Sequence, residues 1–167
     1  ANFGLKINTT SAKINDNGFW EDTEPTSAIF TTGNGAGYST GAATQNFIAY
    51  CFASKKGYSK IGSYKGNDNA DGTFVYTGFS PAWVMIKRID SANDWIILDN
   101  KRNPINPSNE RILANTNAAA STANTMVDFL SNGFKPRSTY GGINSVNNFI
   151  YMAFAENPFV TSTGVPA

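Results

Sequence analysis

The sequence contains no histidine and only one cysteine, and these absences remove several kinds of chemistry at once. Without histidine there is no Ser-His-Asp or Cys-His catalytic arrangement, and one cysteine cannot hold a zinc ion alone. Cys51 cannot form a disulfide within the chain. Because free cysteine is among the most buried residue types, we expect Cys51 to be a small buried hydrophobe. We also expect no bound metal and no cofactor.

The charges show no bias toward either sign. The chain has 13 lysines and arginines and 12 acidic residues, which gives a net charge of +1. No basic cluster is longer than Lys55-Lys56 or Lys87-Arg88. Nucleic-acid-binding proteins cluster basic residues on one face, so we expect no nucleic-acid partner. No apolar run approaches the roughly 20 residues that a helix needs to cross a bilayer. We therefore expect a soluble chain that does not insert into a membrane.

Short apolar runs separated by Gly, Asn and Pro predict an all-β fold, either a sandwich or a barrel. Leu and Glu are few, whereas Asn, Thr, Ser and Gly are common, which disfavours helices and favours turns. One stretch, 117–127, is expected to form a helical turn or two. The expected strands are 47–54, 59–66, 74–79, 82–89, 94–100, 110–116, 126–134 and 149–156. In 82–89 both faces are apolar up to Lys87, which indicates a central strand covered on each side.

The chain also contains an internal repeat of about 100 residues. The stretch "NFIAYCFASKKGY" (46–58) resembles "NFIYMAFAENPFV" (148–160), and similar segments precede both copies. We predict that residues 1–58 are the carboxy-terminal part of a first unit, 59–160 a complete second unit and 161–167 a tail. The first part either joins the second in one sandwich or belongs to a neighbouring module. We favour one sandwich, because an exposed half-sheet leaves strand edges open.

These phrases, together with "DGTFVYTGFSPAWVMIKRIDS" and "DWIILDNKRN", resemble a repeated domain of unknown function in virion structural proteins of tailed bacteriophages. The resemblance covers Leu5 to Phe159. It implies an antiparallel β-sandwich, jelly-roll or concanavalin-like, in a fibre, tail or capsid-surface protein of the virion, an extracellular particle. The strand pair that normally opens a unit is missing before Leu5, and the first residue is not Met. We therefore expect that the chain starts midway through a unit.

Candidate sites for chemistry are few. The loop "NDNADG" (67–72) begins like a calcium loop, but Gly78 stands where a bidentate Glu is required, so we interpret 67–72 as a connecting loop. Glu21, Asp22 and Glu24 lie beside Trp20 and are interpreted as a solvated turn that Trp20 anchors. Asp128 and Glu156 fall in apolar strands, but no pair of carboxylates can be assembled from the sequence. We expect a non-enzymatic protein.

Three aromatic residues are candidates for contact with a glycan or a partner: Tyr38, Tyr140 and Trp20. Tyr38 and Tyr140 lie in corresponding Gly-rich loops, where an exposed ring can stack on a sugar or fill a partner's pocket. The main hypothesis is a virion building block that contacts other copies of itself and other virion proteins, as a homo-oligomer joined through open strand edges. The alternative is a lectin-like module that binds glycan on the host surface.

Overall fold

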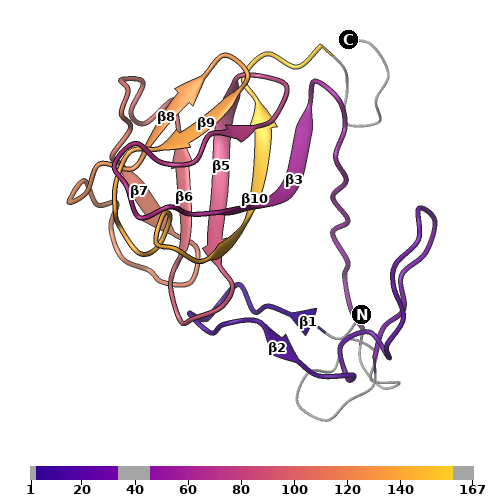
Figure 1. Ribbon diagram of the computed structural model, residues 1–167. Coiled ribbons are helices and arrows are strands. Elements are labelled where there is room, and N and C mark those ends of the chain that lie inside the picture. The colour runs from indigo at the N-terminus through magenta and orange to yellow at the C-terminus, as the bar shows by residue number, and fades with distance from the viewer. Residues whose placement is uncertain (1–2, 34–45, 160–167) are drawn as a thin grey trace.

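The computed structural model describes residues 3–33 and 46–159, which form β-strands and no helix (Figure 1). The all-β prediction is therefore confirmed over these residues. The helical turns expected at 117–127 are wrong, because Ser121 instead forms an antiparallel bridge with Arg111. The strands are β1 (Phe3–Gly4), β2 (Ile14–Asn15), β3 (Ser59–Lys65), β4 (Val75–Tyr76), β5 (Pro81–Arg88), β6 (Trp95–Asp99), β7 (Arg111–Leu113), β8 (Val127–Leu130), β9 (Gly133–Pro136) and β10 (Asn148–Ala155).

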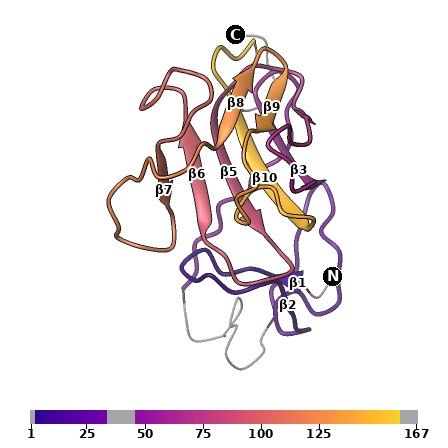
Figure 2. The ribbon, with the colours of Figure 1, turned by 60° about the vertical axis from the view of Figure 1, so that its left-hand side comes forward.

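The described strands form three antiparallel sheets. A five-stranded sheet has the order β3-β10-β5-β6-β7, a three-stranded sheet the order β4-β9-β8, and β1 and β2 form a small third sheet. β10, the last strand, lies between β3 and β5 and pairs with both along most of its length. Figures 1 and 2 show β8 and β9 lying across the five-stranded sheet, with β1 and β2 beyond one end of it.

The two larger sheets share one hydrophobic core. Successive residues of a strand point to opposite faces, so every second residue of the five-stranded sheet faces the three-stranded sheet. Val84 and Ile86 of β5 are fully buried in this way, and so is Phe134 of β9 on the opposing sheet. The buried cluster comprises Tyr64, Val75, Phe79, Val84, Ile86, Ile96, Leu98, Met126, Val127, Phe134, Ile143, Phe149, Tyr151 and Ala153.

Tyr64 of β3 connects the parts of this core. Its ring stacks on Phe149 of β10, with centroids 5.1 Å apart, and meets Phe134 of β9 edge-on at 5.9 Å. Its hydroxyl donates a hydrogen bond of 2.6 Å to the carbonyl oxygen of Ile143. Burial raises the pKa of the Tyr64 phenol well above its ordinary value. The phenol therefore stays protonated and remains a donor at neutral pH.

The opposite face of the five-stranded sheet carries a row of apolar side chains, which we call the outer stripe. Strand register aligns Ile61 with Met152, Met152 with Met85, Met85 with Ile97 and Ile97 with Ile112. The row therefore crosses all five strands, and each of its members is half-buried. The expectation that strand 82–89 is covered on both faces is thus only partly correct. Trp83 and Met85, on this outer face, are half-buried rather than covered.

Both edges of the five-stranded sheet are blocked by the chain itself. At β3, the Ser54 hydroxyl accepts a hydrogen bond from the Ile61 amide at 3.0 Å and lies 3.3 Å from the Ile61 carbonyl oxygen, to which it donates. Thr73 donates to the Lys65 carbonyl oxygen at 2.8 Å. At β7, Arg111 exchanges two backbone hydrogen bonds with Ser121. The expectation of open strand edges therefore fails for this sheet, because such capping prevents a further strand from pairing there.

Residues 5–13 run along one end of the five-stranded sheet. The Asn93 amide donates to the Thr10 carbonyl oxygen at 2.8 Å, and the indole nitrogen of Trp95 donates to the Lys6 carbonyl oxygen at 3.0 Å. The fully buried Lys87 also donates to the Thr10 carbonyl oxygen, at 3.3 Å. Burial lowers the pKa of Lys87. These hydrogen bonds attach the amino-terminal segment to the sheet.

The two similar stretches of the repeat have different structures, so the repeat of about 100 residues is not shown. Residues 148–155 form β10 between β3 and β5, whereas 46–54 are exposed and form no strand. β10 is buried because strands lie on both of its sides, and the described residues contain no second pair of strands for 46–54. Cys51, expected to be buried, is exposed for the same reason. The division into 1–58, 59–160 and 161–167 remains a prediction.

Candidate functional site

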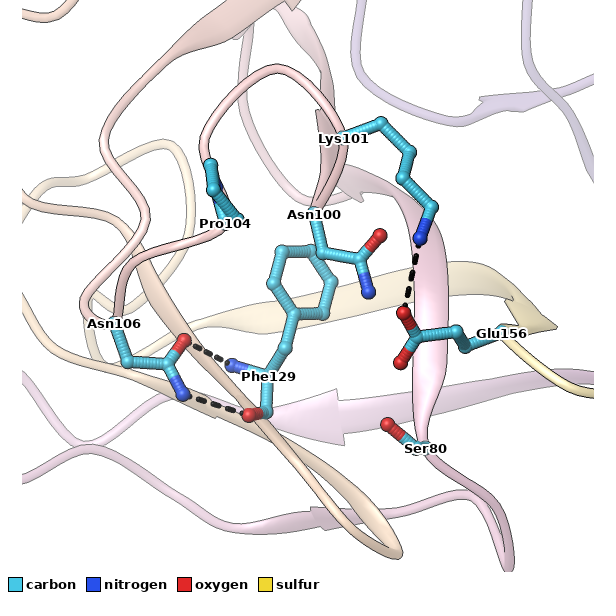
Figure 3. Close-up of a pocket in the computed structure, with 7 residues that line it drawn as sticks. All are labelled: Ser80, Asn100, Lys101, Pro104, Asn106, Phe129 and Glu156. Atoms are coloured by element: carbon cyan, nitrogen blue, oxygen red, sulfur yellow. Dashed lines mark hydrogen bonds and ion pairs between the residues drawn. The ribbon is translucent and has the colours of Figure 1, made fainter.

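A polar pocket of about 350 Å³ lies where several segments meet at the ends of strands (Figure 3). We call it the end pocket. It is lined by residues from the loop between β6 and β7, including the turn directly after β6, and from β8. The residue before β5 and the residue after β10 complete it. Its lining residues are Ser80, Asn100, Lys101, Pro104, Asn106, Phe129 and Glu156.

The turn after β6 is held by Asp99. Its carboxylate accepts hydrogen bonds from the Lys101 amide at 3.0 Å and the Arg102 amide at 2.8 Å, and from the Arg102 Nε at 2.6 Å. Burial alone would raise the pKa of Asp99, but the hydrogen bonds from Arg102 and Lys101 outweigh it and lower the pKa. The tightened turn presents Asn100 and Lys101 to the pocket (Figure 3).

Glu156 provides the carboxylate of the end pocket. Lys101 Nζ lies 3.0 Å from its Oε1, and the Glu156 amide donates to the Ser80 carbonyl oxygen at 2.8 Å. The hydrogen bond from Lys101 lowers the pKa of Glu156, with smaller contributions from Asn100 and Ser80. Glu156 is therefore ionised at neutral pH, and its charge is balanced by Lys101.

Phe129 supplies an aromatic ring in the middle of the pocket (Figure 3). The side-chain amide of Asn106 accepts from the Phe129 amide at 2.9 Å and donates to the Phe129 carbonyl oxygen at 2.7 Å. These two bonds take the place of the backbone hydrogen bonds that a neighbouring strand would make, and they fix the backbone of Phe129. Asn100 Oδ1 is buried and has no hydrogen-bond partner among the described residues.

A second hollow, of about 940 Å³, lies between amino-terminal segments, and we call it the amino-terminal groove. Trp20 lines it, and its indole nitrogen donates to the Phe3 carbonyl oxygen at 3.0 Å. The groove is otherwise lined largely by residues 23–31 and 49–53. Ile29 and Tyr50 are among its exposed apolar side chains, at 68% and 80% exposure.

The structure does not bring the three predicted aromatic contacts together. Trp20 lines the amino-terminal groove, and Tyr38 lies outside the described residues. Tyr140 is half-buried against the core, with the Arg111 guanidinium 4.7 Å from the centre of its ring. One face of the Tyr140 ring is therefore already occupied. A contact role for these residues remains a prediction.

The acidic residues weighed in the sequence do not assemble into a paired site. Glu156 bonds to Lys101, whereas Asp128 lies 3.3 Å from Arg137. Within the described residues there is no group of three His, Cys, Asp or Glu side chains able to hold a metal. In loop 67–72, Asn67 and Asn69 instead accept hydrogen bonds from backbone amides two residues further on, which agrees with a connecting loop.

Sequence reasoning missed the end pocket. The sequence marks Glu156 only as one of two acids in apolar strands, and Asn100, Lys101 and Phe129 carry no distinguishing signal. Their segments are separated by up to 56 positions (156 − 100), and only the strand order brings them together.

The fold and sites define a class: an antiparallel all-β domain with a shared two-sheet core, a polar pocket at strand ends and exposed apolar surface. The chain belongs to the family described as Domain of unknown function (DUF7483), which matches residues 1–158. Neither the curated proteins nor the solved structures contain a match to it. Across residues 3–33 and 46–159, no helix has the length and apolar character needed to span a membrane.

Proposed function

We propose that the chain is a non-enzymatic structural module of a bacteriophage virion, folded as an antiparallel β-sandwich and used in particle assembly. Its place is a fibre, tail or capsid surface, and its partners are other copies of itself and other virion proteins. The sequence resemblance suggests this class. The outer stripe is the single observation that carries an assembly role.

Antiparallel sheets usually cover one face with a core and present polar residues to water on the other. Here the second face carries an aligned apolar row, with Met152 and Met85 at its middle. Trp83 and Phe154 extend it, with ring centroids 5.6 Å apart. Contiguous apolar surface of this kind marks protein contacts, and methionine adapts readily to a partner.

The amino-terminal groove adds to this apolar surface. Phe52, which lines the groove, packs edge-on against Phe154 of β10, with centroids 6.0 Å apart. The groove and the outer stripe therefore adjoin. Because both edges of the five-stranded sheet are blocked, a partner is expected to approach this face rather than to extend the sheet.

The test is a charge placed in the outer stripe. Met85→Lys should weaken association with other copies about tenfold or more, because a partner would have to bury an unpaired ammonium. Ser131→Lys is the control, on an exposed residue of the turn between β8 and β9, away from this face. Association is measured by light scattering over a concentration series, with circular dichroism as a check on folding. A wild-type chain that stays monomeric at high concentration and does not enter particles would refute the proposal.

A second candidate function is binding of host-surface glycan by a lectin-like module. The observation that favours it is the end pocket, where an aromatic ring, an amide and a carboxylate converge. Polar groups of this kind around an aromatic surface are typical of small-molecule recognition sites.

A further inference from the structure

We propose that the end pocket binds one or two units of an uncharged sugar, through Glu156, Lys101 and the ring of Phe129. This inference rests on the glycan-binding alternative above and gives it a site, different from the loop tyrosines suggested by the sequence. It is independent of the assembly role, which uses the outer stripe.

The charges in the pocket select against charged ligands. Lys101 and Glu156 form an ion pair of 3.0 Å, so the pocket holds one positive and one negative group with no net charge. An anionic ligand would meet the Glu156 carboxylate, and a cationic ligand would have to displace Lys101. A hydroxyl group both donates and accepts, so neighbouring sugar hydroxyls can donate to Glu156 and accept from Lys101 without breaking the pair.

Phe129 provides the apolar surface that a sugar ring needs. Its ring is half-buried, and its backbone is fixed on both sides by Asn106, which acts as a positioning residue. Aromatic faces pack well against the C–H face of a sugar. The volume of about 350 Å³ is near the lower end of ligand pockets, about 300–1,000 Å³, and suits one or two rings.

The pocket is arranged for binding rather than for hydrolysis. Glycoside hydrolysis uses two carboxyl groups on opposite sides of the bond. Among the described lining residues Glu156 is the only acid. The carboxylate of the nearby Asp99 already accepts hydrogen bonds from Arg102 Nε and from the backbone amides of the turn.

The inference is tested by NMR on the full chain, labelled with ¹⁵N and titrated with glucose, galactose, mannose, N-acetylglucosamine and their disaccharides. At least one of these should shift the amide signals of residues around the pocket. Glu156→Gln should weaken that binding about tenfold or more, because a hydrogen bond to a charged group is lost. Glu110→Gln, the same change outside the pocket, should leave the affinity unchanged.

A second variant tests the charge argument. Lys101→Met leaves Glu156 without its cation, so protonated glucosamine should bind this variant more tightly than it binds the wild type. An unchanged or weaker affinity for glucosamine would contradict the role assigned to the ion pair.

The outcomes separate the proposals. If sugars bind but the pocket signals do not move and Glu156→Gln has no effect, the end pocket is overturned while the glycan-binding alternative stands. If none of the sugars binds, both are overturned, and the assembly proposal is unaffected.

Discussion

Removing the Tyr64 hydroxyl is the sharpest test of the core that joins the two larger sheets. In Tyr64→Phe the ring keeps its packing against Phe149 and Phe134, but the buried carbonyl oxygen of Ile143 loses its 2.6 Å hydrogen bond. Leaving a buried acceptor unpaired costs about 1–3 kcal/mol. For a chain of this size each kcal/mol lowers Tm by about 2–4 °C, so the expected loss is roughly 2–12 °C.

The assay is thermal and urea unfolding followed by circular dichroism. Tyr76→Phe is the matched control because Tyr76 is 62% exposed, and its free energy of unfolding should stay within about 0.5 kcal/mol of wild type. If Tyr64→Phe is as stable as this control, the hydroxyl does not support the core and the reasoning is refuted. A spectrophotometric titration gives a second check, since Tyr64→Phe should remove one phenol that ionises only well above the ordinary pKa.

Two further predictions concern a close backbone contact and a turn. In Gly66→Ala the new Cβ would clash with the Ser145 carbonyl oxygen, so the free energy of unfolding in urea should fall by about 1–3 kcal/mol. An unchanged value would contradict this close backbone contact. The pKa of Asp99 is lower in the folded chain than in the unfolded chain, where it is about 3.9. The ionised carboxylate therefore contributes its full stabilisation of the fold above about pH 3.9, and this contribution is lost as the pH falls through the folded-state pKa. The free energy of unfolding of the wild type should therefore fall on acidification below about pH 4. Asp99→Asn should be less stable than the wild type at neutral pH and should lose less stability in acid. If the stabilities of the two proteins depend on pH in the same way, this account is contradicted.

Strands with a strong hydrophobic pattern could be predicted from the sequence. The run 94–100 contains β6, and the runs 82–89 and 149–156 overlap β5 and β10 in all but their first residue. Their apolar and β-branched residues favour a buried sheet wherever partners exist. The run 126–134 was predicted as one strand but is two, β8 and β9, joined at Ser131-Asn132. The signal was present, since Ser-Asn-Gly is a turn sequence.

The segment 46–54 could not be predicted correctly from its own residues. It shares Asn, Phe and Ile with the start of β10, yet β10 is buried only because β3 and β5 lie on either side of it. Strand formation here depends on partners far away in the sequence. The end pocket was missed for a related reason, because its residues come from segments that only the sheet topology brings together.

The most direct test of the proposed assembly role is the reactivity of Cys51, the only cysteine of the chain. It is exposed and precedes Phe52, whose ring packs on Phe154 beside the outer stripe. N-ethylmaleimide labelling is measured by mass spectrometry on the dilute chain, the urea-unfolded chain and the virion particles of which we propose it is a part. The account predicts that Cys51 reacts in the dilute chain about as fast as in the unfolded chain and is protected in the particle. Equally fast labelling in the particle would show that this surface stays uncovered and would contradict the account.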